Sequence, residues 1–358
     1  IRDSFSPDNS QIATASQDNT VRLWQTQAGA PSIILAEHND AVFSAAFSPD
    51  GQLVATASED ETAKIWDLAS GQVVQTLADH NQSVNDIVFS PNGQLVATAS
   101  SDWLARLWNP ATGQLQLPTL NHRGAVNAVA FDSEGLQLAT ASNDGFARVW
   151  QLPVSSNSAE IWLQQETAVV SVAFDPAGIY LAAGLANGNI TLWDLRDQTL
   201  INTFQEHSGP IHGLAFNPDG TLLASASNDG TAKIWHVASG TVARTFSGHA
   251  GAVRSIAFSP DGRQVATASV DRTVKVWKTD TGQTVRTLLG HTSTVFSVHF
   301  SPDGTQLVTA GFDRTAQVTQ LTELTTLFAQ ALAQAKRPLT ATECEQYLHG
   351  LPCHLVGD

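Results

Sequence analysis

The sequence is nearly free of the residue types and runs that mark secreted and membrane proteins. Its two cysteines, Cys344 and Cys353, both lie near the end, so residues 1–343 cannot contain a disulfide. That usage fits a reducing compartment. No apolar run approaches the ~18 residues of a membrane-spanning helix, and the first residues do not form a signal peptide. We therefore expect a cytoplasmic protein without membrane contact.

Positive charge is also scarce. Lys and Arg number 18 against 33 Asp and Glu, which gives a formal net charge of −15. A surface with that balance repels phosphate backbones, so a nucleic-acid-binding module is only an alternative to the reading developed below. The glycines lie at predicted turns rather than in a phosphate-binding loop, and no pair of carboxylates stands apart from the repeated ones. The sequence therefore predicts no catalytic residue and no cofactor.

What the sequence has instead is a long repeat. A phenylalanine recurs every 42 residues, with one step of 43, at Phe5, Phe47, Phe89, Phe131, Phe174, Phe216, Phe258 and Phe300. A tryptophan follows 19 residues after each of the first seven, and Thr319 takes its place in the eighth. A fixed period of this length indicates a repeat architecture of eight units.

Each unit reads as four short strands. In the second unit, residues 41–47 alternate in polarity, and the Ser-Pro-Asp-Gly sequence at 48–51 predicts a turn. Residues 53–58 and 62–67 predict the second and third strands, and a fourth follows the Ser70-Gly71 turn. Because four antiparallel strands cannot bury both of their faces alone, the units are expected to stack radially into a closed β-propeller.

The repeated residues resemble those of the WD-repeat family of β-propellers. The family pattern is a Gly-His pair, a Phe-Ser-Pro-Asp-Gly turn, an Asp in the next tight turn and a closing Trp-Asp. Gly248-His249 and Gly290-His291 keep the first pair, and Trp66-Asp67 and Trp193-Asp194 keep the last. The resemblance covers roughly residues 1–320 and implies an all-β fold, a closed propeller of four-stranded antiparallel blades.

The number of units sets the expected number of blades. Eight units predict eight blades, with seven blades plus an extra unit as the alternative, because seven is usual in the family. The last unit has no fourth strand and Ile1 begins too late to supply one, so the closing strand is expected upstream of this chain. The fifth unit departs most, with Gln165 for His and Ala183 for Thr, and is interpreted as an eroded blade.

Residues 321–358 are predicted to form a separate helical tail. After Val318 the apolar period changes from 2 to 3.6, and Thr340 to Glu343 form a capping-box start for a second helix. The tail resembles the extension of bacterial multidomain proteins in which a WD-repeat region follows a STAND-type NTPase, a caspase-like peptidase, a TIR domain or a kinase.

The tail also contains the strongest candidates for metal ligands, Cys344, His349, Cys353 and His354. Their spacing fits none of the common two-plus-two zinc patterns, and the adjacent Cys353 and His354 would struggle to reach one ion together. We therefore predict no metal site.

A His, a hydroxyl, an Asp and a Trp recur in phase in five units and suggest a hydrolase. A catalytic site needs one such set beside a pocket, whereas five sets around a ring favour a structural network in which each buried polar group finds a partner. The family resemblance implies the same role. The sets are His38, Thr56, Asp60 and Trp66; His80, Thr98, Asp102 and Trp108; His122, Thr140, Asp144 and Trp150; His207, Ser225, Asp229 and Trp235; and His249, Thr267, Asp271 and Trp277.

The positions that vary between units are the candidates for function. In the family, partners bind on the wide face, where the His-bearing loops and the turns between the second and third strands emerge. Exposed aromatic residues and Arg dominate interface energetics. The predicted partner-binding residues are Phe43, Trp103, His212, Arg254, Val270, Phe296 and Phe312.

These observations predict a non-catalytic protein-interaction scaffold. It would be the partner- or ligand-sensing domain of a larger bacterial signalling or defence protein, with the effector domain upstream on the same polypeptide. The alternative from another class is a propeller enzyme with a site in the central channel. That would need a non-repeated cluster of acids, His or metal ligands facing the channel, and the sequence shows none.

Overall fold

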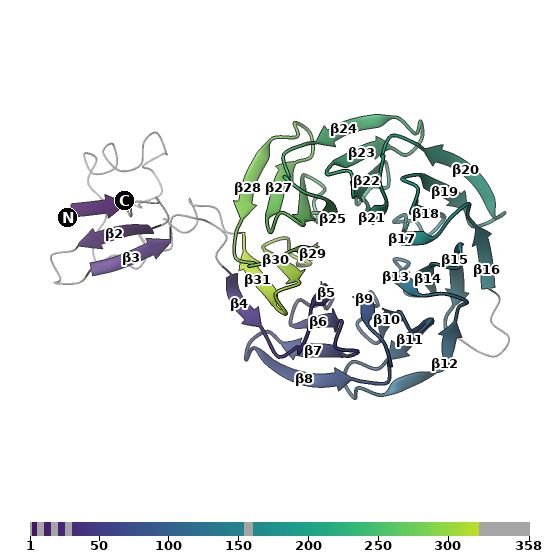
Figure 1. Ribbon diagram of the computed structural model, residues 1–358, viewed down its shortest axis with the longest axis horizontal. Coiled ribbons are helices and arrows are strands. Elements are labelled where there is room, and N and C mark those ends of the chain that lie inside the picture. Colours follow the sequence, from purple (N-terminus) through teal and green to yellow (C-terminus); the bar gives the residue numbers. More distant parts are fainter. Residues whose placement is uncertain (1, 6–10, 16–20, 26–30, 154–159, 322–358) are drawn as a thin grey trace, which may run out of the picture. The chain divides into compact units, whose positions relative to one another are not determined.

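The structure is a computed structural model that describes residues 2–5, 11–15, 21–25, 31–153 and 160–321 (Figure 1). The chain divides into two compact units, one formed by Ile1–Ala28 with Leu321–Asp358 and the other by Gly29–Gln320. All regular structure in the described residues is β-strand. Those residues include no helix long and apolar enough to cross a membrane. The predicted helical tail lies outside the described residues, apart from Leu321.

The smaller compact unit, Ile1–Ala28 with Leu321–Asp358, contains the first three strands of the first repeat. Strands β1 (Arg2–Phe5), β2 (Gln11–Ala15) and β3 (Val21–Gln25) form an antiparallel sheet in the order β1-β2-β3. Phe5 pairs with Ile12, and Ile12 pairs with Trp24. The Phe and Trp of this repeat therefore lie at the same level of the sheet as their equivalents in the other repeats.

The larger compact unit, Gly29–Gln320, is a ring of seven four-stranded antiparallel blades, each with its first strand innermost (Figure 1). Blades 1 to 3 are β5 (Val42–Phe47), β6 (Leu53–Ser58), β7 (Ala63–Asp67) and β8 (Gln72–Leu77); β9 (Val84–Phe89), β10 (Val96–Ser100), β11 (Leu104–Trp108) and β12 (Leu115–Asn121); and β13 (Val126–Phe131), β14 (Gln137–Ser142), β15 (Phe146–Gln151) and β16 (Glu160–Gln164).

Blades 4 to 6 are β17 (Val169–Phe174), β18 (Tyr180–Leu185), β19 (Ile190–Asp194) and β20 (Thr199–Phe204); β21 (Ile211–Phe216), β22 (Leu222–Ser227), β23 (Ala232–His236) and β24 (Val242–Phe246); and β25 (Val253–Phe258), β26 (Gln264–Ser269), β27 (Val274–Lys278) and β28 (Thr284–Leu288). Blade 7 is β29 (Val295–Phe300), β30 (Gln306–Gly311), β31 (Ala316–Gln320) and β4 (Pro31–Leu35).

Blade 7 takes its fourth strand from the first repeat. In the β4–β31 ladder, Leu35 lies opposite Ala316 and Ile33 opposite Val318. The prediction of eight blades is therefore wrong for the described structure, and so is the prediction that the closing strand lies upstream of this chain. The physical reason is that β4 pairs with the open edge of β31 instead of with β3, which removes that edge and closes the ring.

The alternating burial of β4 fixes its register. Leu35 is buried and Ile34 is exposed, so one face of the strand joins the core between blades 7 and 1. A shift by one residue would reverse these two side chains.

The hydrophobic core lies between blades rather than within them. Ala55, Ile65 and Leu77 of blade 1 pack against Ile87 and Trp108 of blade 2, and similar clusters recur around the ring. Small residues on the second strand of a blade leave room for the bulky side chains of the next blade. Because each blade buries its face only against a neighbour, closing the ring leaves no blade with an uncovered face.

The Ser-Pro-Asp-Gly turns form as predicted. The hydroxyl of Ser48 donates to Asp50 at 2.6 Å, the N–H of Gly51 donates to the carbonyl of Ser48 at 2.9 Å, and Gly51 takes a φ of +69°. These turns lie at one end of the ring, here called the proline-turn face. The loops that carry the histidines and the turns between second and third strands lie together at the other end, here called the His-loop face.

Candidate interaction face

A buried hydrogen-bond network of four side chains holds blade 1 together at the His-loop face. His38 lies 2.9 Å from Asp60 through Nδ1 and 2.7 Å from the hydroxyl of Thr56 through Nε2, and the indole N–H of Trp66 donates to that hydroxyl at 2.8 Å. Burial alone would raise the pKa of Asp60, but hydrogen bonds from His38 and Thr62 hold it well below its usual range. Every polar group in this set has a partner, as a structural role requires.

The same network forms in blades 2, 5 and 6. The distances from His to Asp, from His to the hydroxyl and from the indole N–H to the hydroxyl lie between 2.7 and 2.9 Å in all three. Blade 7 keeps the bonds of His291 to Asp313 and to Thr309, while Thr319 stands where the other blades have Trp. Repetition around the ring argues against a catalytic set at any one of these places.

Blade 3 departs from the prediction that Asp144 orients His122. Asp144 instead pairs with Arg148, whose guanidinium N–H groups donate to its two oxygens at 3.1 and 2.6 Å. Nδ1 of His122 contacts the carbonyl of Leu120 at 3.2 Å. Burial and the charge of Arg148 lower the pKa of His122 to about 4. The prediction is wrong for this blade because a buried arginine takes the carboxylate.

The outer strand of blade 3 explains why Arg148 stays buried. Its guanidinium lies 4.1 Å from the ring centroid of Trp162 and 5.3 Å from that of Phe146. The two rings pack edge to face at 5.5 Å. Trp162 therefore packs at the edge of the blade, over Arg148 and Phe146.

Blade 4 lacks the network, as its sequence indicates. Gln165 replaces the histidine and accepts a hydrogen bond from Thr191 at 2.9 Å. With Ala183 in the hydroxyl position, the buried indole N–H of Trp193 has no partner. The blade keeps its strands and its apolar packing while losing one polar interaction.

An aromatic cluster lies on the His-loop face where blade 7 meets blade 1. Phe43 and Phe296 pack edge to face with their centroids 5.2 Å apart, and Phe296 lies 6.3 Å from Phe312. Phe43 and Phe296 are half-buried, whereas Phe312 is 51% exposed. The structure thus brings together three of the predicted partner-binding residues, and it leaves the outermost ring open to solvent.

His212 and Arg254 are neighbours on the same face in blades 5 and 6. A guanidinium N–H of Arg254 donates to Nε2 of His212 at 2.7 Å. Burial, with the charge of Arg254, lowers the pKa of His212 to about 4, and Asn228 hydrogen-bonds the same ring. Val270, also predicted to bind a partner, is exposed in the turn of blade 6 that follows β26.

Trp103 occupies an unusual backbone conformation in the equivalent turn of blade 2. It has a φ of +71° and is 55% exposed. Blades 3, 4 and 5 have Gly145, Gly188 and Gly230 at this position, also with positive φ. A bulky side chain there is strained, and such strain often accompanies a functional position.

Asn85 of blade 2 and Asn127 of blade 3 occupy the position that Phe43, Arg254 and Phe296 occupy in their blades, and they have a structural role. The amides of Asn85 and Asn127 donate to the backbone carbonyls of Val126 and Val169 in the next blade, at 2.8 and 2.7 Å. The face is therefore asymmetric. At this position blades 5, 6, 7 and 1 have His212, Arg254, Phe296 and Phe43, whereas blades 2 and 3 have amides that are already paired, and blade 2 adds the exposed Trp103 in its turn.

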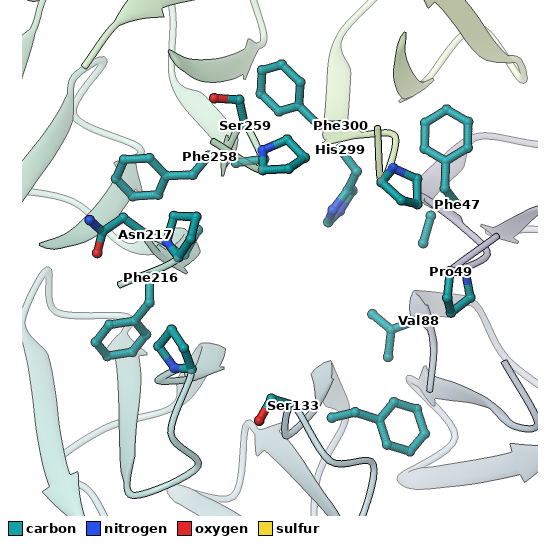
Figure 2. A pocket seen from close by; sticks show the side chains of 18 of the residues that line it. Phe47, Pro49, Val88, Ser133, Phe216, Asn217, Phe258, Ser259, His299 and Phe300 are labelled. Carbon is teal, nitrogen blue, oxygen red and sulfur yellow. The ribbon is translucent and has the colours of Figure 1, made fainter. Parts of the chain in front are cut away.

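The central channel holds two residues that the sequence analysis missed. A cavity of about 570 Å³ opens at the proline-turn face, lined by the repeated Phe-Ser-Pro turns, and the imidazole of His299 points into it (Figure 2). Asp86 lies in an inner strand, where it accepts from Ser44 at 2.8 Å and from the N–H of Val129 at 3.0 Å. Burial raises the pKa of Asp86, and His299 opposes that shift.

The signal that marks Asp86 and His299 was available in the sequence. The other six blades of the ring have small residues at these positions, namely Ser, Ala or Gly for Asp86 and Ala or Val for His299. The hydrogen bonds of Asp86 tie blades 1, 2 and 3 together, which is a structural role. Within the described ranges, no three His, Cys, Asp or Glu residues are arranged to hold a metal ion. Cys344, His349, Cys353 and His354, for which the sequence predicts no metal site, lie outside these ranges.

Comparison with known families agrees with this geometry. A model of the WD domain, G-beta repeat, matches residues 2–25, 198–236, 240–278 and 282–319. A model of the IFT122 first beta-propeller matches residues 43–212. A search of curated proteins gives no match. The chain therefore contains WD repeats, and its residues Gly29–Gln320 form a β-propeller of four-stranded blades.

Proposed function

We propose that the propeller is a protein-interaction module that binds its partner on the His-loop face, over blades 5, 6, 7 and 1. WD-repeat propellers generally bind protein partners and typically act as non-catalytic scaffolds, which supports this function. The observation that carries the choice of face is the aromatic cluster of Phe43, Phe296 and Phe312. An exposed ring backed by two half-buried rings is a rigid apolar anchor of the kind found at interface centres.

Site-specific photo-crosslinking tests the face. A photoreactive side chain at position 312 is expected to crosslink a partner protein in extracts of the source cells. The matched control is position 136, because Leu136 is 57% exposed against 51% for Phe312 but lies on the proline-turn face. Crosslinks from 136 and not from 312 would place the interface on the other face.

Alanine substitution of Phe296, Phe312 and Trp103 provides the second test. The triple variant is expected to lose capture of the crosslinked partner without a fall in its melting temperature. Capture at the wild-type level would contradict the proposed face.

We also propose a context for this module, as the sensing region of a larger cytoplasmic bacterial signalling protein. The resemblance of residues 321–358 to the tails of such proteins supports this context. Sequencing the gene upstream of the codon for Ile1 tests it, and the absence of an effector domain there would contradict it.

A further inference from the structure

Arg254 is a partly buried cation without an acidic partner. Its Nε is buried and makes no hydrogen bond, and among the described residues its guanidinium bonds only to the imidazole of His212. The chain has a net charge of −15 and 33 acidic residues, so carboxylates are plentiful. The other buried arginines of the ring, Arg106 and Arg148, each pair with an aspartate.

The neighbours of Arg254 hold its guanidinium in place and do not neutralise it. His212 is uncharged at neutral pH, because burial and Arg254 lower its pKa to about 4. The neutral ring therefore accepts from Arg254 through Nε2, and Asn228 hydrogen-bonds the same ring. A preorganised guanidinium that keeps its charge is suited to bind an anion, because little side-chain entropy is lost on binding.

Blades 6 and 7 make this sector of the His-loop face basic. Arg272 and Arg314 are exposed in the turns that follow Asp271 and Asp313, at the positive-φ position. The loops at residues 248–253 and 290–295 contain no acidic residue. The two aspartates are engaged by His249 and His291. Three arginines thus lie in one sector of an otherwise acidic protein.

Apolar surface adjoins these charges. Val270 and Phe312 are exposed immediately before Asp271 and Asp313, and Phe296 occupies in blade 7 the position that Arg254 occupies in blade 6. At this position, side chains of consecutive blades contact each other, as Arg254 does His212 and Phe296 does Phe43. The sector therefore combines one fixed guanidinium with an adjacent aromatic surface.

We propose that this sector binds a partner segment in which a carboxylate side chain, Asp or Glu, stands close to an aromatic or large aliphatic residue. The carboxylate of the partner pairs with Arg254, and the exposed Arg272 and Arg314 lie on either side of it. The apolar side chain of the partner packs on Phe296 and Phe312. A planar guanidinium matches the two oxygens of a carboxylate. The proposal rests on the proposed function, since it specifies the chemistry of the partner on the same face.

Selection of peptides tests the proposal. A phage-displayed library of random dodecapeptides is selected on the whole chain, and enriched peptides are synthesised with a fluorophore for measurement of Kd by fluorescence polarisation. Enriched sequences are expected to contain an acidic residue within a few positions of an aromatic or aliphatic one. Enrichment of sequences without acidic residues would overturn the proposal.

Substitution of Arg254 then identifies the contact. Arg254→Gln is expected to raise Kd about 10- to 100-fold, as for loss of a charged hydrogen bond. Replacing the peptide carboxylate by its amide is expected to have the same effect, with no further loss when both changes are combined. Arg123→Gln is the matched control, an exposed arginine in the His-bearing loop of blade 3, and it is expected to leave Kd within twofold. Equal binding by Arg254→Gln would overturn the proposal.

Two further outcomes distinguish failure of the carboxylate site from failure of the proposed interaction face. If Phe312→Ala abolishes binding while Arg254→Gln does not, the interaction face stands and the carboxylate site fails. If neither variant changes Kd, both fail. Binding at least tenfold tighter to the same peptide with phosphoserine in place of Asp or Glu would overturn the assignment of a carboxylate. Melting temperatures of all variants, compared with the wild type, exclude loss of folding as the cause.

Discussion

The backbone N–H of Ala45 donates to the hydroxyl of Ser297 at 3.1 Å, although 252 residues separate them. The bond joins the inner strands of blades 1 and 7. The N–H of Val298 makes the same kind of bond to Ser255 between blades 7 and 6, at 3.2 Å. The interface at which the ring closes is therefore built like its other interfaces, and β4 completes the blade on one side of it.

Removal of β4 is expected to open the ring. A chain starting at residue 36 lacks the strand that pairs with β31, so its melting temperature should fall and the exposed edge should promote aggregation. A chain starting at residue 29 is the control, because it keeps the whole compact unit Gly29–Gln320. Differential scanning calorimetry and size-exclusion chromatography measure both effects. Equal stability of the two truncated chains would contradict closure by β4.

The hydroxyl at the centre of the blade 1 network is expected to be important for stability. Thr56→Val preserves shape but leaves Nε2 of His38 and the indole N–H of Trp66 without a partner. The free energy of unfolding should fall by about 2–4 kcal/mol, since each buried unsatisfied group costs about 1–3 kcal/mol. Thr76→Val, in the exposed outer strand of the same blade, should change it by less than about 0.5 kcal/mol. Urea denaturation distinguishes the two variants.

A hydroxyl restored in blade 4 is expected to stabilise the protein. Ala183→Ser places an acceptor beside the unpaired indole N–H of Trp193, as Ser225 does for Trp235 in blade 5 at 2.8 Å. The gain should be about 1 kcal/mol. Ala182→Ser buries a hydroxyl on the opposite face of the same strand and should destabilise instead. A loss of stability in the first variant would show that the site cannot accommodate the oxygen.

The buried His122 makes stability depend on pH. Its pKa is lowered to about 4 in the folded protein, against about 6.5 in an unfolded chain. Between these values the unfolded state binds a proton that the folded state does not, so this contribution is complete above pH 6.5 and is lost as the pH falls toward 4. The loss amounts to about 3 kcal/mol.

His122→Gln tests this dependence, with the glutamine of blade 4 as a natural precedent. The slope of unfolding free energy against pH between 6.5 and 4 should be smaller than in the wild type by the equivalent of one proton. The aspartates act in a separate window. Asp271 and Asp313 have pKa values lowered to about 2, so their contribution is lost only below about pH 4. An unchanged slope would show that His122 is not the group responsible.

The strained backbone at Trp103 is expected to lower the stability of the protein. Trp103→Gly removes a Cβ from a position with a φ of +71° and should raise the free energy of unfolding by about 0.5–1 kcal/mol. Trp103→Ala keeps the Cβ and should give no gain. If the glycine variant is less stable than the wild type in thermal unfolding, Trp103 contributes packing that outweighs its strain.

The repeat made much of the fold predictable. The Ser-Pro-Asp-Gly turn, the strands around Phe47 and the His–Thr–Asp–Trp sets follow from residues that lie close in sequence and recur in phase. The network around His38 has the predicted bonds because its four members lie within one blade. The residues of the aromatic cluster were also foreseeable, since Phe296 and Phe312 stand at positions that vary between units while the framework around them stays constant.

Competition between side chains was not predictable in this way. Blades 2 and 3 both have an arginine four residues after the turn aspartate, yet Asp102 keeps its bond to His80 and Asp144 loses its bond to His122. Arg106 donates to one oxygen of Asp102 at 2.7 Å and leaves room for His80, whereas Arg148 donates to both oxygens of Asp144 and lies under Trp162 of the outer strand. That contact depends on packing between strands that the local sequence of either one does not report.

The sequence by itself determined the local structure, the strands, turns and polar sets, because each depends on residues within about 42 positions of one another. It also marked the varying positions of the His-loop face. Only the tertiary structure decided that seven blades form and that Pro31–Leu35 closes the ring. Strand pairing depends on which backbone edge is open, and that is a property of the assembled ring and not of any repeat.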